Sequence, residues 1–238
     1  MRRQASFSGE ALGGGTAASR DQAALAERQP GQPLRVAVFA SGGGSNFQAL
    51  ADAIADGSLH AELKLLVCDK PQAPVVERAA KAGVPAFVFR PKEYDSREAY
   101  EEEILLRLRE AEVELVVLAG YMRILTDVMV QGYWGRMLNI HPSLLPSFPG
   151  MHAVRQALEY GVKVTGVTVH LVDGGLDSGP IVAQRAVELR EDDTEETVSE
   201  RIHHIEHQLY PQVVQDIATG RIVLEQLAGR NQTKKDGI

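Results

Sequence analysis

Short apolar runs alternate with longer, more polar stretches through the first half of the chain. The apolar runs cover Leu34–Ala40, Leu63–Cys68, Ala86–Phe89 and Leu115–Ala119. The stretches between them carry apolar residues at helical spacing and cover Ser45–Asp56, Ala73–Ala82 and Asp95–Glu110. Strands that alternate with helices indicate βαβ units, so the sequence predicts a parallel sheet with helices on both faces.

The pattern changes after Tyr133. Met137–Ile140 is a further apolar run, whereas Val162–Leu171 and Ile181–Leu189 alternate apolar and polar residues with period two. Such alternation is typical of strands with one solvated face, and the turn between the last two runs is rich in glycine. The sequence therefore predicts an antiparallel strand pair appended to the parallel sheet.

A long helix closes the predicted fold. From about Thr194 its apolar residues lie on one face, at Val198, Ile202, Ile205, Leu209 and Val213. We expect Pro211 to kink this helix and Gly220 to end it. Asp95 with Glu98 is a candidate capping box for the earlier helix. Together these elements predict a Rossmann-like α/β fold, with a mostly parallel twisted sheet.

The two ends differ from this pattern. Residues 1–33 hold a Gly-Gly-Gly run and few large apolar side chains, so we expect a disordered N-terminal extension. A short helix over Asp21–Arg28 is the alternative, and in isolation it would be marginal. Residues 228–238 are expected to form a flexible C-terminal tail. One domain over residues 34–227 remains.

Composition and charge narrow the function classes. Of 238 residues, 25 are Lys or Arg and 32 are Asp or Glu, which gives a net charge of −7 and argues against a general nucleic-acid binder. The single cysteine, Cys68, cannot form an internal disulfide, which favours a reducing cytoplasm. The sequence contains no apolar run of the roughly 18–20 residues that a membrane helix needs, and the N-terminus lacks a signal-peptide pattern.

The first candidate site is the turn Ser41–Asn46, between the first strand and the first helix. Its glycines allow a ligand to approach the backbone closely, and the helix N-terminus offers free N–H groups to a phosphate. The P-loop lysine is missing, and Phe47 stands where the third glycine of a dinucleotide fingerprint belongs. A ligand-free turn is the alternative. Asp69, after the second strand, is interpreted as a cap of the following turn rather than a ribose contact.

The second candidate site is Asn139 with His141. Residues i and i+2 of a strand share a face, so both side chains point together at the end of a strand where α/β sheets bind ligands. An amide donor beside a histidine suits a carbonyl whose oxygen becomes negative during attack. A simple His-Pro turn is the alternative. Asp177, in the glycine-flanked loop Asp173–Pro180, is a candidate carboxylate partner for His141.

His203 and His207 lie one turn apart on the last predicted helix. This pair is half of a metal site at most, because the sequence offers no third ligand at suitable spacing. We therefore interpret the two histidines as part of a solvated helix face and predict no metal.

Several segments, in this order, carry a resemblance to a known family. They are Ala40–Asn46, Leu118–Leu125, Leu138–Pro146, Phe148–His152, Asp173–Pro180 and Tyr210-Pro211. Together they resemble the folate-dependent formyltransferases, and the Ser-Gly-x-Gly-Ser-Asn turn resembles the branch that acts on glycinamide ribonucleotide, the phosphoribosylglycinamide formyltransferases. The resemblance covers about residues 34–225 and implies the Rossmann-like formyltransferase fold in a cytoplasmic monomer or homodimer.

The resemblance also implies a reaction and its residues. The formyl group would pass from 10-formyltetrahydrofolate, a co-substrate, to the amine of glycinamide ribonucleotide in purine biosynthesis, with no metal required. The implied catalytic residues are Asn139, His141 and Asp177, with His170 bordering the site. The implied ribonucleotide contacts are Gly44, Ser45, Asn46 and Glu206. The implied folate contacts are Arg97, Met122, Arg123, Ile124, Leu125, Asn139, Asp173, Leu176 and Asp177.

Two departures from the family pattern stand out. Gly43 occupies a position where the family often has Asn, and Gly174-Gly175 makes the folate loop more flexible than an acidic pair would. Because the chain is acidic, attraction of anionic substrates has to be local. We expect it to come from the helix N-terminus at Gly44–Asn46 and from a few cations such as Arg97 and Arg123.

Three alternatives stay open. A formyltetrahydrofolate deformylase would use water in place of the amine, but its family carries an N-terminal regulatory domain for which residues 1–33 are too few and too polar. Methionyl-tRNA formyltransferase needs an added RNA-binding domain and shares only the Asn-x-His core. A non-catalytic nucleotide-binding module would not need Asn139, His141 and Asp177. We expect small-molecule substrates and neither a nucleic-acid nor a membrane partner.

Overall fold

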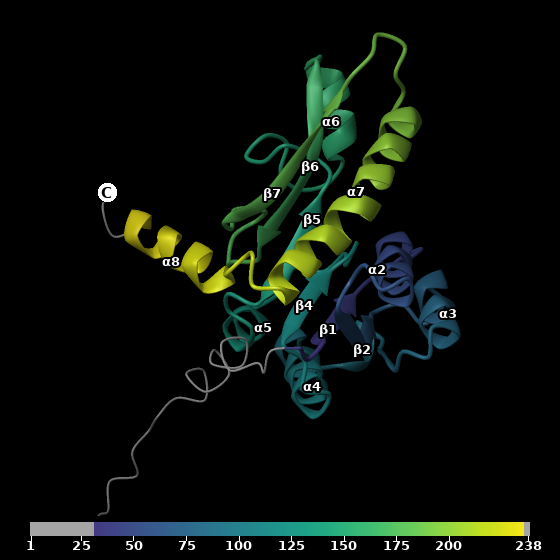
Figure 1. Cartoon of the computed structure of the whole chain (residues 1–238), viewed down its shortest axis with the longest axis vertical. Coiled ribbons are helices and arrows are strands. Elements are labelled where there is room, and N and C mark those ends of the chain that lie inside the picture. Colours follow the sequence, from purple (N-terminus) through teal and green to yellow (C-terminus); the bar gives the residue numbers. More distant parts are fainter. Residues whose placement is uncertain (1–30, 236–238) are drawn as a thin grey trace, which may run out of the picture.

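The computed structural model describes residues 31–235, so the predicted extension 1–33, apart from its last three residues, and the alternative helix within it lie outside the described residues. Seven strands form one sheet in the order β3-β2-β1-β4-β5-β6-β7 (Figure 1). Their bounds are β1 Leu34–Phe39, β2 Ala61–Cys68, β3 Ala86–Val88, β4 Leu115–Leu118, β5 Met137–His141, β6 Val164–Leu171 and β7 Ile181–Glu188.

The strand directions confirm the predicted fold. Strands β1 to β5 pair in parallel, whereas β6 pairs antiparallel with both β5 and β7. The order places β1 next to β4. The connection after β1 leads to β2 on one side of this pair, whereas the connection after β4 leads to β5 on the other side. Ligands of open α/β sheets bind at such a reversal, outside the carboxyl ends of the strands.

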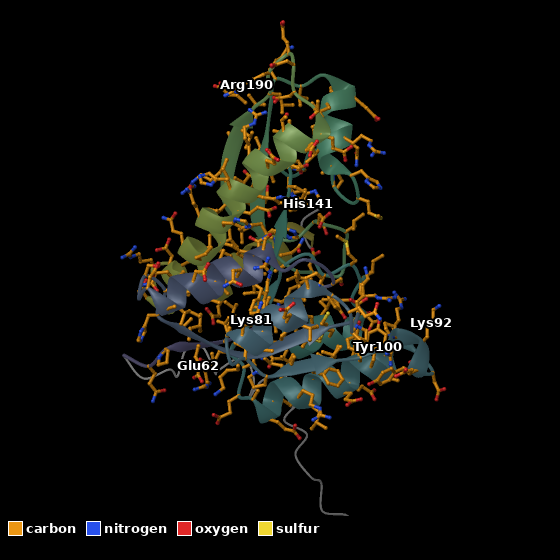
Figure 2. The ribbon with its side chains drawn as sticks, turned by 90° about the vertical axis from the view of Figure 1, so that its right-hand side faces the viewer. Glu62, Lys81, Lys92, Tyr100, His141 and Arg190 are labelled. Atoms are coloured by element: carbon orange, nitrogen blue, oxygen red, sulfur yellow. The ribbon has the colours of Figure 1, made fainter. Side chains whose placement is uncertain are left out.

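Helices cover both faces of the sheet, as predicted. One face carries α2 Ser45–Ala55, α3 Pro74–Lys81, α6 Ala153–Tyr160 and α7 Glu195–Ala218, and the other carries α4 Arg97–Glu110 and α5 Asp127–Gly132. Side chains of β1 alternate between the two cores: Val36 and Val38 lie in the first, Ala37 and Phe39 in the second. Tyr100 of α4, labelled in Figure 2, is 1% exposed within the second core.

The caps of the long helices differ in part from the prediction. The Asp95–Glu98 capping box is wrong: Ser96 is the N-cap of α4, and its Oγ accepts a hydrogen bond from the N–H of Ala99 at 3.1 Å. Helix α7 begins after Thr194, continues through Pro211 and ends at Ala218, two residues before Gly220.

Some elements were not predicted at all. These are α5, α6, the 3-10 turn η2 Pro91–Glu93 and helix α8 Leu224–Lys235. Helix α8 includes most of the segment 228–238, for which the sequence predicted no regular structure. Within residues 31–235, no helix is both long enough and apolar enough to cross a membrane.

The carboxyl ends of β1 and β4 meet at the topological reversal. The N–H of Ser41 donates to the carbonyl of Gly120 at 3.1 Å, and the Ser41 Oγ accepts from the N–H of Met122 at 2.9 Å. From α7, the buried Tyr210 hydroxyl donates toward the carbonyls of Leu118, at 2.9 Å, and Leu138, at 3.2 Å. These bonds fix the ends of β1, β4 and β5 relative to one another, and both candidate sites begin there.

Candidate active site

The glycine-rich turn opens helix α2 and has a geometry that only glycine supports. Gly44 has a φ of +72°, and a Cβ added there would lie 2.4 Å from the Cγ2 of Val75. No residue in the described part of the chain accepts a hydrogen bond from the backbone N–H groups of Gly42–Ser45. These donors, together with the positive end of the α2 dipole, make a seat for an anion.

Asn46 and Glu206 form the buried wall of this seat. The Nδ2 of Asn46 donates to the Oε2 of Glu206 at 2.8 Å, which joins the first turn of α2 to α7. Burial raises the pKa of the Glu206 carboxyl, and the hydrogen bond from Asn46 opposes this only in part. The Asn46 Oδ1 is buried and has no partner among the described residues. A polar ligand can therefore complete this wall.

Asn139 and His170 face each other across β5 and β6. The register pairs these two residues directly, and their Nδ2 and Nε2 atoms lie 3.1 Å apart. The His170 Nδ1 lies 2.8 Å from the carbonyl of Leu171, which can only accept, so Nδ1 carries a hydrogen. Nε2 lies between the Asn139 amide and the Oδ1 of Asp177, which is 3.6 Å away.

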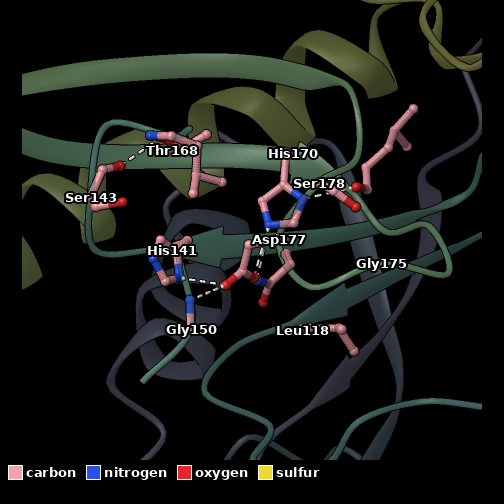
Figure 3. Close-up of polar contacts among 12 residues, drawn as sticks. Leu118, His141, Ser143, Gly150, Thr168, His170, Gly175, Asp177 and Ser178 are labelled. Carbon is pink, nitrogen blue, oxygen red and sulfur yellow. Dashed lines mark hydrogen bonds and ion pairs between the residues drawn. The ribbon is translucent and has the colours of Figure 1, made fainter. Parts of the chain in front are cut away.

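Asp177 is the hub of the site (Figure 3). Its Oδ2 accepts from the N–H of Gly150 at 2.8 Å, and its Oδ1 lies 3.4 Å from the Nδ2 of Asn139. The contact with His170, at 3.6 Å, contributes most to lowering the pKa of Asp177 to about 2, and the Gly150 N–H and the charge of His141 add to it. The carboxylate is therefore ionised at neutral pH.

His141 ends β5 and has an acceptor at each ring nitrogen. Its Nδ1 lies 3.4 Å from the Oδ2 of Asp177, and its Nε2 lies 2.8 Å from the carbonyl of Phe148. Because a carbonyl only accepts, Nε2 carries a hydrogen, and Nδ1 is satisfied when it too is protonated. The residue is 5% exposed. The site thus offers a ring N–H beside a fixed negative charge.

The loop between β4 and α5 is held by two buried acids. Arg123 Nε donates to the Oδ2 of Asp69 at 2.8 Å, so Asp69 does not cap the following turn as predicted. Thr126 donates its N–H and its hydroxyl to Glu101, which is fully buried. The side chains of Met122 and Ile124, on either side of Arg123 in the same loop, are about 70% exposed.

The sequence of this chain matches known proteins over most of the region that the structure describes. Residues 34–214 match the family described as Formyl transferase. The chain belongs to this family.

Relatives of the formyl transferase family extend the match. Phosphoribosylglycinamide formyltransferase of Bacillus subtilis (strain 168) is 53% identical over 183 residues, which is 77% of this chain and 94% of the relative. A human trifunctional purine biosynthetic protein, adenosine-3, is 44% identical over 190 residues, which is 80% of this chain but 19% of that protein.

Solved structures agree with these relatives. Glycinamide ribonucleotide transformylase 1 from Geobacillus kaustophilus is 51% identical and has a TM-score of 0.77, with 79% of this chain and 100% of that chain covered. The same-named protein from Symbiobacterium toebii is 44% identical and has a TM-score of 0.79, with 83% and 94% covered. Fold and sequence therefore identify the same group of formyl transferases.

The structure brings together most of the residues that the sequence singled out. Asp177 contacts Asn139, His141 and His170, and the helix start at α2 brings together Gly44, Ser45, Asn46 and Glu206. The apolar folate candidates divide: Leu176 is 64% exposed, whereas Leu125 packs against the core on the α4 side.

Three of the charged residues that were predicted to contact the folate are either bonded to other parts of the protein or form no polar contact with a described residue. Arg97 is exposed in the first turn of α4, and its guanidinium forms no hydrogen bond or ion pair with a described residue. The Arg123 guanidinium is engaged by Asp69. Asp173 holds its own loop, since its Oδ1 accepts from Gly175 at 3.0 Å and from the Ser178 hydroxyl at 2.8 Å.

Sequence reasoning missed the groups that support the site, namely Arg78, Glu101, Phe148 and Gly150. Phe148 and Gly150 lie in a segment that carries the family resemblance, but they contribute through backbone atoms, to which no sequence pattern assigned a role. Arg78 and Glu101 act through contacts between distant segments, which no local pattern marks. Of the predicted solvated histidines, His203 is exposed, whereas His207 is half-buried and stacks on it at 6.4 Å. Residues 31–229 contain no group of three His, Cys, Asp or Glu side chains placed to hold a metal ion.

Proposed function

We propose that this chain transfers a formyl group from 10-formyltetrahydrofolate to the amine of glycinamide ribonucleotide, in purine biosynthesis. One observation carries the proposal: the Gly42–Asn46 turn after β1 and His141 at the end of β5 open at the same edge of the sheet. The first suits a phosphate, and the second suits a carbonyl that becomes negative. The names of the relatives support formyl transfer and, as one of the two substrates, glycinamide ribonucleotide.

In the proposed reaction, the amine attacks the formyl carbon and the carbonyl oxygen gains negative charge. The amide of Asn139 and the Nε2–H of His141 donate to that oxygen. We expect the formyl oxygen to replace the Phe148 carbonyl, which now lies 2.8 Å from Nε2. Loss of one such donor typically costs about 2.7–4 kcal/mol of transition-state stabilisation.

In the proposed reaction, the carboxylate of Asp177 places a negative charge beside the path of the proton that leaves the attacking amine. Its ionised carboxylate lies 3.4 Å from the Nδ1 of His141, so it stabilises positive charge that develops on the ring while Nε2–H donates to the oxyanion. A water bound to Asp177 then carries the proton from the attacking amine to the leaving nitrogen of the folate. The products are the formylated ribonucleotide and tetrahydrofolate, and positioned proton transfer contributes about 10²–10⁴-fold.

The substrates are assigned to the two subsites as follows. The phosphate lies on the N–H groups of Gly44, Ser45 and Asn46, and Glu206 contacts polar groups of the ribonucleotide. The folate ring lies on the exposed apolar side chains of Met122, Ile124 and Leu176, beside the backbone of the 121–126 and 173–177 loops. Arg97 is assigned to the folate carboxylates.

The proposed chemistry requires no metal, because Asn139 and His141 meet the charge on the oxygen. We propose that the protein works in the cytoplasm, as a monomer or homodimer, on small-molecule substrates alone.

A direct assay separates this function from hydrolysis on the same fold. The protein is mixed with 10-formyltetrahydrofolate, with and without glycinamide ribonucleotide, and release of tetrahydrofolate is followed. We expect release only when the ribonucleotide is present, in equal amount to the formylated product. Release without the ribonucleotide would identify a deformylase, and the absence of release in both mixtures would favour a non-catalytic binding module.

A further inference from the structure

Each carbonyl of the Gly42–Gly44 turn already has a hydrogen-bond donor. The carbonyl of Gly42 accepts from the N–H of Val75 at 3.2 Å, and that of Gly44 accepts from the N–H of Gln48 at 2.9 Å. The carbonyl of Gly43 accepts from the Nε of Arg78 at 2.8 Å. The N–H groups of the turn are therefore the backbone groups left for a ligand. Of the three bonds to the carbonyls, only the one from Arg78 depends on a side chain.

The side chain of Arg78 links helix α3 to the turn and to helix α2. Besides its bond to the turn, its Nη1 donates to the Oε1 of Gln48, on the second turn of α2, at 3.1 Å. The Nε2 of Gln48 in turn donates to Asp52 at 2.8 Å. The planar guanidinium therefore fixes the turn against the helix that it opens, a geometry that a lysine ammonium does not reproduce.

Arg78 forms no ion pair with any residue in the part of the chain that the structure describes, whereas Arg123 is paired with Asp69. Arg78 and Ser45 both line a groove of about 810 Å³ between α2 and α7. The same groove is also lined by the acidic residues Asp52, Asp56 and Asp216. In a protein of net charge −7, the guanidinium therefore reduces the repulsion that an incoming phosphate meets at the turn.

We propose that Arg78 is a positioning residue for the phosphate-bearing substrate. It binds the carbonyl of Gly43, the middle residue of the turn, so that this carbonyl does not face the ligand. Its side chain also brings a positive charge from α3 to the turn. The proposal rests on the proposed function for the nature of the substrate, but its test measures binding of a phosphate ester directly and does not depend on turnover.

The test compares Arg78→Ala and Arg78→Lys with a matched control on the same helix. Lys81→Ala removes the same charge one turn further along α3; Lys81, labelled in Figure 2, pairs with Glu77 at 2.8 Å and not with the turn. Titration calorimetry with ribose 5-phosphate gives the dissociation constant of each protein. Steady-state kinetics gives kcat and the KM for each substrate, and thermal unfolding gives the Tm.

We expect Arg78→Ala to weaken ribose 5-phosphate binding and to raise the KM for the ribonucleotide by about tenfold or more, which is typical of a lost charge-assisted hydrogen bond. The KM for the folate and kcat should change less than about twofold, since the contacts of His141 and Asp177 do not involve α3. Arg78→Lys should lie between the wild type and Arg78→Ala, and Lys81→Ala should match the wild type.

Unchanged binding by Arg78→Ala would overturn the proposal, and so would an equal loss in Lys81→Ala or an equal rise in the KM for the folate. If Arg78→Ala does not fold, Arg78→Lys carries the same test, because it keeps the charge and loses the fork. Absence of ribose 5-phosphate binding by the wild type would overturn the phosphate seat itself, whereas binding without formyl transfer would overturn only the proposed function.

Discussion

Gly150 donates its backbone N–H to the Oδ2 of Asp177 at 2.8 Å, and this bond joins two loops that follow different strands. The same oxygen lies 3.4 Å from the Nδ1 of His141. One carboxylate oxygen therefore holds the 148–152 segment at Gly150 and faces the ring of His141. Asp177 has a φ of +49°, a conformation that Asp tolerates better than most residues.

Replacement of Asp177 by Asn tests its role in catalysis. Asn keeps an oxygen for the Gly150 N–H but removes the charge that faces His141, so we expect kcat to fall by about 10²–10⁴-fold in a variant that still folds. The matched control is Asp192→Asn, which removes the same charge from an exposed loop. Near-normal kcat in Asp177→Asn would remove Asp177 from the mechanism.

The pKa of Asp177 also predicts a pH dependence of stability. The folded pKa of about 2 lies below the ordinary value of 3.8, so the contribution to the free energy of unfolding is complete above that ordinary value and is lost as pH falls toward 2. The shift corresponds to about 2 kcal/mol. Urea unfolding should show wild type and Asp177→Asn differing by about this amount near pH ~6, and by much less near pH ~2.5. A gap that does not change with pH would contradict this assignment.

Glu206 changes the free energy of unfolding with the opposite dependence on pH. Because burial raises its folded pKa, its contribution to stability is present below the ordinary value of 4.5 and is lost as pH rises through the folded pKa. Glu206→Gln still accepts from Asn46, so we expect this variant to unfold at higher urea than the wild type in mildly alkaline buffer. Its KM for the ribonucleotide should nevertheless rise by about tenfold.

The control for Glu206 is Glu200→Gln, on the exposed side of the same helix, which should leave both the urea midpoint and the KM unchanged. Equal or lower stability of Glu206→Gln at alkaline pH would show that the buried charge is compensated by groups other than Asn46.

Gly44→Ala tests the close approach of α3 to the turn. The new Cβ would lie 2.4 Å from Val75 in a backbone region with φ of +72°, so we expect a loss of about 1–3 kcal/mol in the free energy of unfolding. Gly43→Ala is the control, because a Cβ there meets nothing within 4 Å. Adding Val75→Ala to Gly44→Ala should recover part of the loss, and no recovery would mean that the backbone conformation alone accounts for it.

The elements that were predicted correctly have long or strictly apolar patterns. The run ending at Ile140 placed Asn139 and His141 on one face, because side-chain direction in a strand depends only on position. Helix α5 has six residues, too few for a helical period to be distinguished from an ordinary apolar cluster.

The wrong helix cap has a local cause. Ser96 lies inside the motif that suggested Asp95 as the cap, and both residue types favour that position, so spacing alone does not choose between them.

The other missing information is tertiary. The meeting of Asp177 with His141 depends on the path of the loop after β6, because β6 runs antiparallel to β5 and ends beside Leu138, near the amino end of β5. Arg78 has the spacing of any solvated helix arginine, and only the path of the turn beside it gives it a task.

The groups assigned to the formyl chemistry all come from a single stretch of chain, from Asn139 to Asp177, on two adjoining strands and the loops that follow them. The groups assigned to the amine-bearing substrate come from the Gly42–Asn46 turn, from α3 and from Glu206 on α7. Donor chemistry and acceptor choice are thus inherited on separate segments. Evolution can therefore exchange the molecule that receives the one-carbon unit by altering the turn and its neighbouring helices, while the strands that deliver this unit stay the same.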